Sequence, residues 1–305
     1  MVVAKRKHIR SKTMENYSLS KKPNNNPIII GGNGGSGTRV VAEILLRAGV
    51  FLGHDLNSSN DNLLFTYLFK HPNIFFHEDN TYLGSDCPES QSLLKLHEKL
   101  FFKQLPSTIS EWKLFLNAGL NHTRNRYNWR WVRQRWLNIV KSQTEGNNTF
   151  LWGWKEPQTI FFLKDIKKIY PQAKFILIVR DGLDMVYNKN IQQMQYWSNH
   201  YQINSQDLSN ENRFEYWYRS NRQTIDLAFK LFSKNFMIVK FEDLCLKKIS
   251  TITQIFDFIG LEDKPEKSSK IYQIPQIPNS YQIHLQFDTK WIDSETKSKL
   301  ANLGY

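Results

Sequence analysis

The stretch "PIIIGGNGGSGTRVVAEIL", residues 27–45, reads as a buried strand, a glycine-rich turn and a helix in succession. The glycines allow backbone N–H groups to crowd around an anion without Cβ clashes. The helix beginning near Thr38 directs its positive end to the same place, and the hydroxyls of Ser36 and Thr38 are further donors. The stretch therefore predicts a phosphate-binding turn. The alternative is a tight strand–helix turn that holds no ligand.

The glycine turn departs from both common nucleotide-binding patterns. Aligned from Gly32 with the triphosphatase motif G-x-x-x-x-G-K-[ST], it reads GNGGSGTR, so Thr38 stands in place of the lysine and Arg39 comes one position late. The dinucleotide pattern G-x-G-x-x-G also matches from Gly32, but it requires an acid after a second strand. Asp55 lies near that distance, although no convincing strand precedes it. The residues of the turn alone leave the kind of phosphate ligand open.

A second strand carries a basic residue at its end. The run "AKFILIVRDG", residues 173–182, is continuously apolar, which is typical of a parallel strand covered on both faces. Arg180 ends it, at the edge where open α/β sheets bind ligands, and Asn188 follows eight residues later. Arginine holds phosphate through two parallel hydrogen bonds. Together with the glycine turn, this predicts one ligand with two phosphate groups.

Length and composition indicate a folded α/β protein with a basic surface. The chain has 305 residues, of which 40% are hydrophobic. Strands alternate with helices, which predicts a parallel β-sheet flanked by helices. Residues 1–26 read as a disordered basic tail and residues 27–305 as a single domain. The net charge is +13, which reflects either a solvated surface or attraction to a polyanion.

A helical, aromatic insertion is expected at about residues 88–146. Trp129, Val132, Trp136 and Val140 lie at helical spacing, with arginines between them and no acid from 121 to 141. We expect the tryptophans to pack inward and the arginines to form a solvated face. The alternative is a basic lip over an anionic site.

The cysteines and the apolar segments of the sequence indicate where the protein is located. The two cysteines, Cys87 and Cys245, lie far apart, so no disulfide framework is expected and a reducing compartment fits better. No Cys/His cluster indicates a metal. No apolar stretch approaches the roughly 20 residues that cross a bilayer, and the first 26 residues lack the apolar core of a secretory signal. We therefore expect a cytoplasmic protein without a membrane span.

In their order and spacing, these motifs resemble the sulfotransferases that use 3′-phosphoadenosine 5′-phosphosulfate (PAPS). The chain is more similar to members with a "GGSGT" loop than to the cytosolic phenol type. Further resemblances are "GWKEP" (153–157), "KFEDL" (240–244), "DFIGL" (257–261) and the final "LGY" (303–305). The resemblance implies a P-loop NTPase-like sulfotransferase fold. It also implies contacts to PAPS from Gly34, Gly35, Ser36, Gly37, Thr38, Arg39, Arg180 and Asn188.

Three departures from the family pattern concern the donor site. The basic residue that often precedes "SGT" is Gly35 here, and a serine that often follows the arginine by eight positions is Asn188. The C-terminal "RKG" segment of the cytosolic enzymes, which also contacts the 3′-phosphate, has no counterpart. Ser280 and Lys290 are the residues that we consider for that contact.

The resemblance also implies a reaction and its residues. The sulfuryl group would pass to a hydroxyl or amine of a small-molecule or glycan acceptor, without a metal. Lys155 would stabilise the transferring group, with Arg39 as a second cation, and Asp61, followed by Asp55, would accept the acceptor's proton. Other candidate bases are His54 and Glu156. Ordinary roles, as a surface lysine or as helix and turn caps, are the alternatives for these residues.

Two other function classes remain open from the sequence. One is a P-loop-like small-molecule kinase, although the missing lysine counts against it. The other is a non-catalytic protein that binds a polyanion through its basic tail and arginine-rich helix. No nucleic acid partner is expected, and the sequence leaves the oligomeric state open.

Overall fold

The computed structural model describes residues 26–70, 88–102, 104–122, 129–142, 151–262, 264–266 and 268–305. Apart from its last residue, the basic tail predicted at residues 1–26 lies outside the described residues. Cys87 and parts of the predicted insertion also lie outside them.

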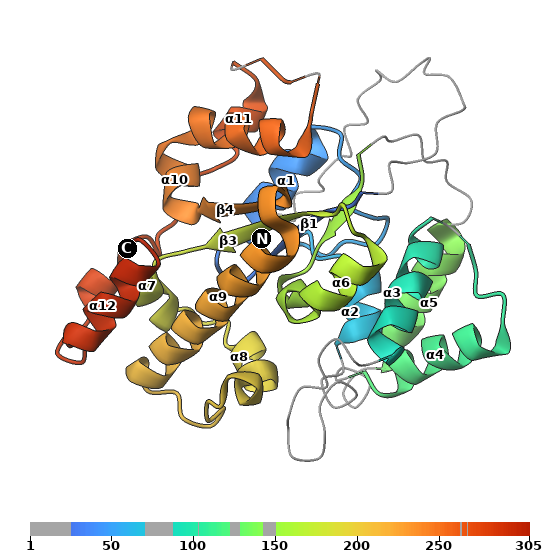
Figure 1. The fold of residues 1–305 in the computed structure, drawn as a ribbon, viewed down its shortest axis with the longest axis horizontal. Coiled ribbons are helices and arrows are strands. Elements are labelled where there is room, and N and C mark those ends of the chain that lie inside the picture. The colour runs from blue at the N-terminus through green and yellow to red at the C-terminus, as the bar shows by residue number, and fades with distance from the viewer. Residues whose placement is uncertain are drawn as a thin grey trace, which may run out of the picture.

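A four-stranded parallel sheet forms the centre of the molecule (Figure 1). Its order is β2-β1-β3-β4, and each neighbouring pair is parallel. The strands are β1 (Ile28–Gly32), β2 (Gly153–Lys155), β3 (Lys174–Val179) and β4 (Phe236–Lys240). The predicted α/β class with a parallel sheet flanked by helices is confirmed.

The isoleucines of β1 alternate between two hydrophobic cores. Ile28 and Ile30 pack with the buried face of α1 (Thr38–Arg47) and with α11 (Lys248–Ile259) on one side of the sheet. Ile29 packs on the other side, in a larger core that includes α9 (Asn210–Phe232). Successive side chains of a strand point to opposite faces, so a strand without polar residues must be covered on both.

The remaining helices complete these two layers and the ends of the molecule. On the larger-core side, α9 runs across the sheet, and α3, α4 and α5 lie together beyond α2 (Figure 1). The bounds of the remaining α-helices are α2 Leu63–Phe69, α3 Pro88–Phe101, α4 Ile109–Leu120, α5 Trp129–Ser142, α6 Leu163–Ile169, α7 Gly182–Val186, α8 Gln192–Trp197, α10 Phe241–Leu246 and α12 Ser294–Asn302. Short 3₁₀ turns join them at Pro157–Phe162, Ser198–Tyr201, Ser233–Asn235, Lys270–Gln273 and Ile283–Gln286.

The predicted helical segment at 88–146 consists of α3, α4 and α5 in its described parts. The inward packing expected of α5 is only partly right. Trp136 packs against the core, but Trp129 is 63% exposed and Val140 is 44% exposed. Arg135, expected on a solvated face, is buried instead. The helix is therefore rotated so that its arginine-containing stripe partly faces the protein.

All four strands end at one edge of the sheet, where the predicted site residues follow. The glycine turn follows β1, Lys155 ends β2, and Arg180 comes directly after β3. The acids of "KFEDL" lie in α10, directly after β4. Because parallel strands present their carboxyl ends together, this edge collects the residues that open α/β sheets use for ligands.

Candidate functional site

The glycine turn runs from the end of β1 to the first turn of α1. Gly35 and Gly37 have φ values of 96° and 98°, a conformation that side chains rarely adopt. A Cβ on Gly37 would lie 2.2 Å from the Phe241 ring, so this position also requires the absence of a side chain. Gly37 precedes α1 without any side-chain cap, which leaves the first N–H groups of the helix to other acceptors. The turn thus has the backbone geometry expected of an anion site.

Side chains from distant elements hold the turn in this conformation. Gly34 N donates to Gln193 Oε1 at 2.6 Å, and Asn33 exchanges hydrogen bonds with Ser220 of α9 at 2.7 and 3.0 Å. The Asn188 amide donates to Gly34 O at 3.1 Å. The predicted residues of the turn and Asn188 are therefore brought together. Gln193 and Ser220 were missed by the sequence analysis because nothing in their local spacing marks them.

Two of the three departures from the family pattern, Gly35 and Asn188, meet in space. A Cβ on Gly35 would lie 1.6 Å from Asn188 Nδ2, so the asparagine amide occupies the space that a side chain at position 35 would need. Glycine at 35 and asparagine at 188 therefore depend on each other.

We predict that Gly35→Ala lowers the free energy of unfolding more than Gly49→Ala does. Gly49 has a similar φ of 87° but open space around it, so its substitution reports backbone strain alone, about 1–2 kcal/mol. Gly35→Ala adds the clash with Asn188, and combining it with Asn188→Ala should recover the difference. Urea denaturation of the wild type, the two glycine variants and the double variant measures these free energies of unfolding. Equal losses for the two glycine variants would contradict the coupling.

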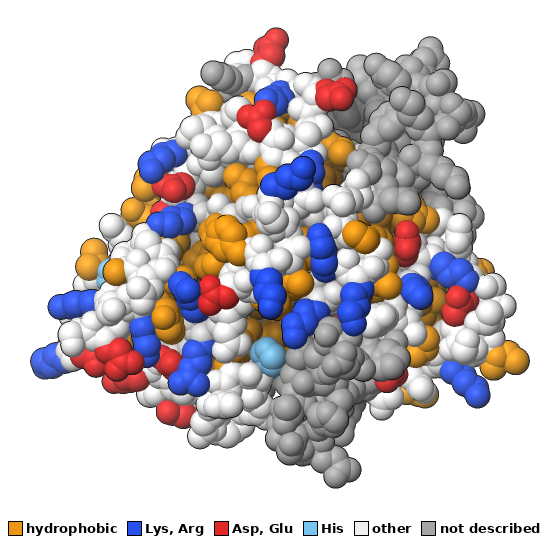
Figure 2. All heavy atoms as spheres, in the orientation of Figure 1, with side chains coloured by type: hydrophobic (Ala, Val, Ile, Leu, Met, Phe, Trp, Pro, Cys, Tyr) orange, Lys and Arg blue, Asp and Glu red, His pale blue; other side chains and the backbone are white. Residues whose placement is uncertain are grey.

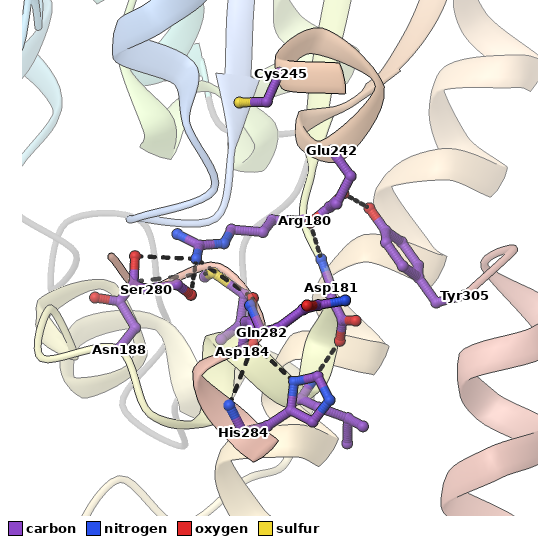
Figure 3. A network of polar contacts seen from close by, with 12 residues as sticks. Arg180, Asp181, Asp184, Asn188, Glu242, Cys245, Ser280, Gln282, His284 and Tyr305 are labelled. Atoms are coloured by element: carbon purple, nitrogen blue, oxygen red, sulfur yellow. Dashed lines mark hydrogen bonds and ion pairs between the residues drawn. The ribbon is translucent and has the colours of Figure 1, made fainter. Parts of the chain in front are cut away.

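Arg180 is buried beside the turn and is held by four groups (Figure 3). One Nη donates to the backbone carbonyl and, at 3.1 Å, to the hydroxyl of Ser280, and lies 3.5 Å from a carboxylate oxygen of Asp184. The guanidinium lies over the Phe241 ring, 5.1 Å from its centroid, and the same ring contacts Gly37. The second predicted phosphate ligand therefore lies next to the glycine turn.

Asp184 joins Arg180 to the C-terminal segment. Its carboxylate accepts a hydrogen bond from Gln282 N at 2.8 Å and lies 2.7 Å from His284 Nδ1 (Figure 3). Ser280, which we considered from the sequence, thus contacts Arg180, whereas Lys290 is exposed and pairs with Asp288. No local spacing could have related Asp184 to residues 98 and 100 positions away.

Two further sequence motifs of the C-terminal half, "KFEDL" and "LGY", contact each other. Glu242 of "KFEDL" accepts hydrogen bonds from Asp181 N at 3.0 Å and from the hydroxyl of Tyr305 at 2.9 Å (Figure 3). Lys240 donates to Gly304 O. The final "LGY" therefore fastens the end of the chain to the strand end beside Arg180, which is a structural role.

Lys155 is buried and its ammonium group is paired with Asp61. It also donates to Ser59 O at 3.2 Å. Asp61 accepts a second hydrogen bond from Asn57 at 2.7 Å. It does not cap α2, as its position allowed, because Asn62 accepts from Phe65 N and is the cap. The lysine and the first choice of base therefore lie in direct contact.

Asp55, the second choice of base, is bound to α5. It forms an ion pair with Arg135 Nε at 2.9 Å and accepts a hydrogen bond from Asn138 at 2.9 Å. Burial raises the pKa of its carboxyl, and these two partners oppose that change. These contacts attach the loop that carries Asp55 and Asp61 to α5.

Glu156, another candidate base, is buried behind Lys155. Its carboxylate accepts a hydrogen bond from Gln158 N at 2.6 Å. Burial, and then the negative charge of Asp61, raise the pKa of Glu156 to about 7, against an ordinary value of 4.5. Its carboxyl therefore titrates near neutrality, next to the paired lysine.

We predict that Glu156 makes folding less favourable as pH rises. The folded protein retains this proton up to about pH 7, whereas the unfolded chain releases it near 4.5. The free energy of unfolding should therefore fall across this range, relative to that of Glu156→Gln. Denaturation of both proteins at several pH values gives the difference, which isolates Glu156 from other titrating groups. A difference that does not change with pH would show that Glu156 ionises normally.

Two predicted donors have no hydrogen-bond partner within the described part of the chain. They are the hydroxyl of Ser36 and Nε of Arg180, both buried. Buried polar groups are nearly always paired, so these two atoms are the candidates in this region for contacts to a bound molecule. Arg39, in contrast, is exposed and forms no ion pair with any residue that the structure describes.

A family model described as the sulfotransferase family matches residues 27–265. This chain belongs to the sulfotransferase family. It is therefore an enzyme of the sulfotransferase class, and the loop, Lys155 and Arg180 all lie in the matched region. No curated protein sequence matches the chain.

Solved structures of two sulfotransferase domains are similar over nearly the whole chain. The domain from the curacin biosynthetic pathway is 14% identical, covering 94% of this chain and 99% of its own, with a TM-score of 0.47. The domain from the Synechococcus PCC 7002 olefin synthase is 16% identical, covering 95% and 99%, with a TM-score of 0.44. The Mycobacterium avium sulfotransferase STF9 is 13% identical, covering 92% and 68%, with a TM-score of 0.39.

Proposed function

We propose that this sulfotransferase takes the sulfuryl group from PAPS and transfers it to a hydroxyl or amine acceptor. The observation that carries the proposal is the pair of unpartnered buried donors, Ser36 Oγ and Arg180 Nε. They belong to the two motifs that the sequence assigns to two phosphates of one ligand. Asn188 donates to Gly34 of the turn, and the Phe241 ring lies against both Gly37 and Arg180, so one ligand would meet both motifs.

The donor-site residues have separate roles in this proposal. Backbone and hydroxyl groups of the turn from Gly34 to Arg39 would hold the 5′-phosphosulfate, together with the first N–H groups of α1. Arg180 and Asn188 would hold the 3′-phosphate. The bound PAPS supplies an activated sulfuryl group whose leaving group is the 3′,5′-bisphosphate. Thr38 cannot replace the lysine of a triphosphatase, which argues against the kinase alternative.

Lys155 would neutralise charge at the leaving oxygen. Its ammonium has three donors, of which Asp61 and Ser59 O take two in this structure. The third is available to a bound anion. Arg39, at the start of α1, would add a second positive charge from the exposed side.

Asp61 is the residue that we propose as the base. Its side chain is 20% exposed, so an acceptor could approach it from solvent, and its pairing with Lys155 places it beside the transferring group. Asp55 fits less well because Arg135 and Asn138 already engage both of its oxygens. Helices α3–α5 would border the acceptor, since α5 supports the loop that carries Asp61.

Calorimetric titration separates this proposal from its alternatives. Adenosine 3′,5′-bisphosphate should bind, and ATP should bind much more weakly. Labelled sulfate should then pass from PAPS to hydroxyl or amine acceptors when phenols, sugars and glycans are screened. Clear ATP binding without bisphosphate binding would favour the kinase, and polyanion binding insensitive to either nucleotide would favour the non-catalytic alternative.

A further inference from the structure

Two neighbouring helices expose apolar side chains at the surface of the protein. On α4 they are Ile109, Leu116 and Leu120, and on α5 they are Trp129, Leu137 and Val140, with exposed fractions of 40–78%. We call these six residues the α4–α5 surface. Monomeric proteins rarely expose such gathered apolar groups without a binding role.

The two groups form one surface rather than two. Within each helix the apolar residues are spaced by three, four, seven or eight positions, so they share a face. Gly119 lies against Val132, and the Trp112 ring lies 5.6 Å from that of Trp136, so α4 and α5 are in direct side-chain contact. Both apolar faces therefore flank the same helix–helix contact.

The basic side chains of this surface give it one sign of charge. Lys113 lies in the apolar face of α4 and Arg133 in that of α5, and Arg130 and Lys141 adjoin them. Helix α5 has no acid, and the single acid of α4, Glu111, is turned to Lys99 of α3 at 2.6 Å. Figure 2 shows hydrophobic and basic side chains at the surface over α4, with single acidic side chains near them.

We propose that the α4–α5 surface adsorbs onto an anionic lipid membrane. Helices that lie in the membrane–water interface typically combine leucine and tryptophan with arginine and lysine. A second copy of the chain would bring like charges together. A partner helix would need a groove, but Trp112 and Trp136 fill the seam between the helices. Among the described helices none is both long and apolar enough to cross a membrane, so the contact would be peripheral.

Co-sedimentation of the full chain with vesicles tests this proposal. The protein should bind vesicles of 30% phosphatidylserine and far less to pure phosphatidylcholine, with loss at high salt. Substituting glutamine for Leu116, Leu120 and Trp129 together should weaken binding at least tenfold. Arg130→Gln and Arg133→Gln should each weaken it about fivefold. The matched control carries glutamine for Leu208, Phe229 and Leu246, which are similarly exposed elsewhere, and should bind as the wild type does.

The apolar triple variant distinguishes this surface from the basic N-terminus. Binding through the N-terminal lysines and arginines would depend on salt but not on Leu116, Leu120 or Trp129. Equal binding by the triple variant and the control would therefore overturn the proposal. A concentration-dependent dimer that the triple variant abolishes, without vesicle binding, would assign the surface to a second copy and also overturn it.

Discussion

Lys155→Met should lower the rate of sulfuryl transfer by about 10²–10³-fold and weaken bisphosphate affinity by a smaller factor. The ammonium group is buried beside Asp61, where a preorganised cation stabilises developing charge far more than it would in water. Removal of one such donor has an effect of this size. Single-turnover transfer from PAPS measures the rate, and calorimetry measures the affinity.

The controls separate catalysis from folding. Lys299→Met removes another partly buried, carboxylate-bound lysine, far from Lys155 in the sequence and paired with Glu215 on α9, and should leave the rate unchanged. Lys155→Arg keeps the charge and should retain part of the activity. A folded Lys155→Met protein with the wild-type rate would exclude Lys155 from the reaction.

Arg180→Gln should weaken binding of adenosine 3′,5′-bisphosphate by about 10²-fold. A charge-assisted pair of hydrogen bonds to phosphate contributes about 3 kcal/mol. Asp184 would still be bonded to Gln282 N and His284, so the substitution should not leave a buried carboxylate without partners. Calorimetric titration of the purified variant measures the loss.

Binding of AMP shows whether the loss of affinity in Arg180→Gln concerns the 3′-phosphate. AMP lacks the 3′-phosphate, so its weaker affinity should be the same for the wild type and Arg180→Gln. Arg219→Gln, which removes an arginine of α9 paired with Glu215, should bind both ligands as the wild type does. Equal loss of AMP and bisphosphate affinity in Arg180→Gln would mean that Arg180 supports the fold of the turn instead.

The sequence predicted those parts of the site that are local. The isoleucines before the glycine turn and the apolar run before Arg180 identify strands covered on both faces, and parallel pairing then brings their ends together. The partners of these residues are long-range. The contact between Lys155 and Asp61 joins residues 94 positions apart, and Ser280 reaches Arg180 across 100. No spacing rule connects such positions.

Where the sequence misled, a tertiary contact overrode a local pattern. The tryptophan spacing in α5 suggested a buried stripe, but Arg135 turns inward because Asp55 gives it an ion pair, and Trp129 is exposed as a result. A helix cap was the alternative role for Asp61, but Asn62 takes that position and Asp61 pairs with Lys155.

The most direct test of the central claim is a crystal structure of the protein with adenosine 3′,5′-bisphosphate. We expect the 5′-phosphate to lie within the turn from Gly34 to Arg39, bonded to Ser36. We expect the 3′-phosphate to lie on Arg180 and Asn188, with Lys155 facing the side from which an acceptor would enter. A bisphosphate bound elsewhere, or one that contacts the turn without reaching Arg180, would contradict the claim that both motifs serve one ligand.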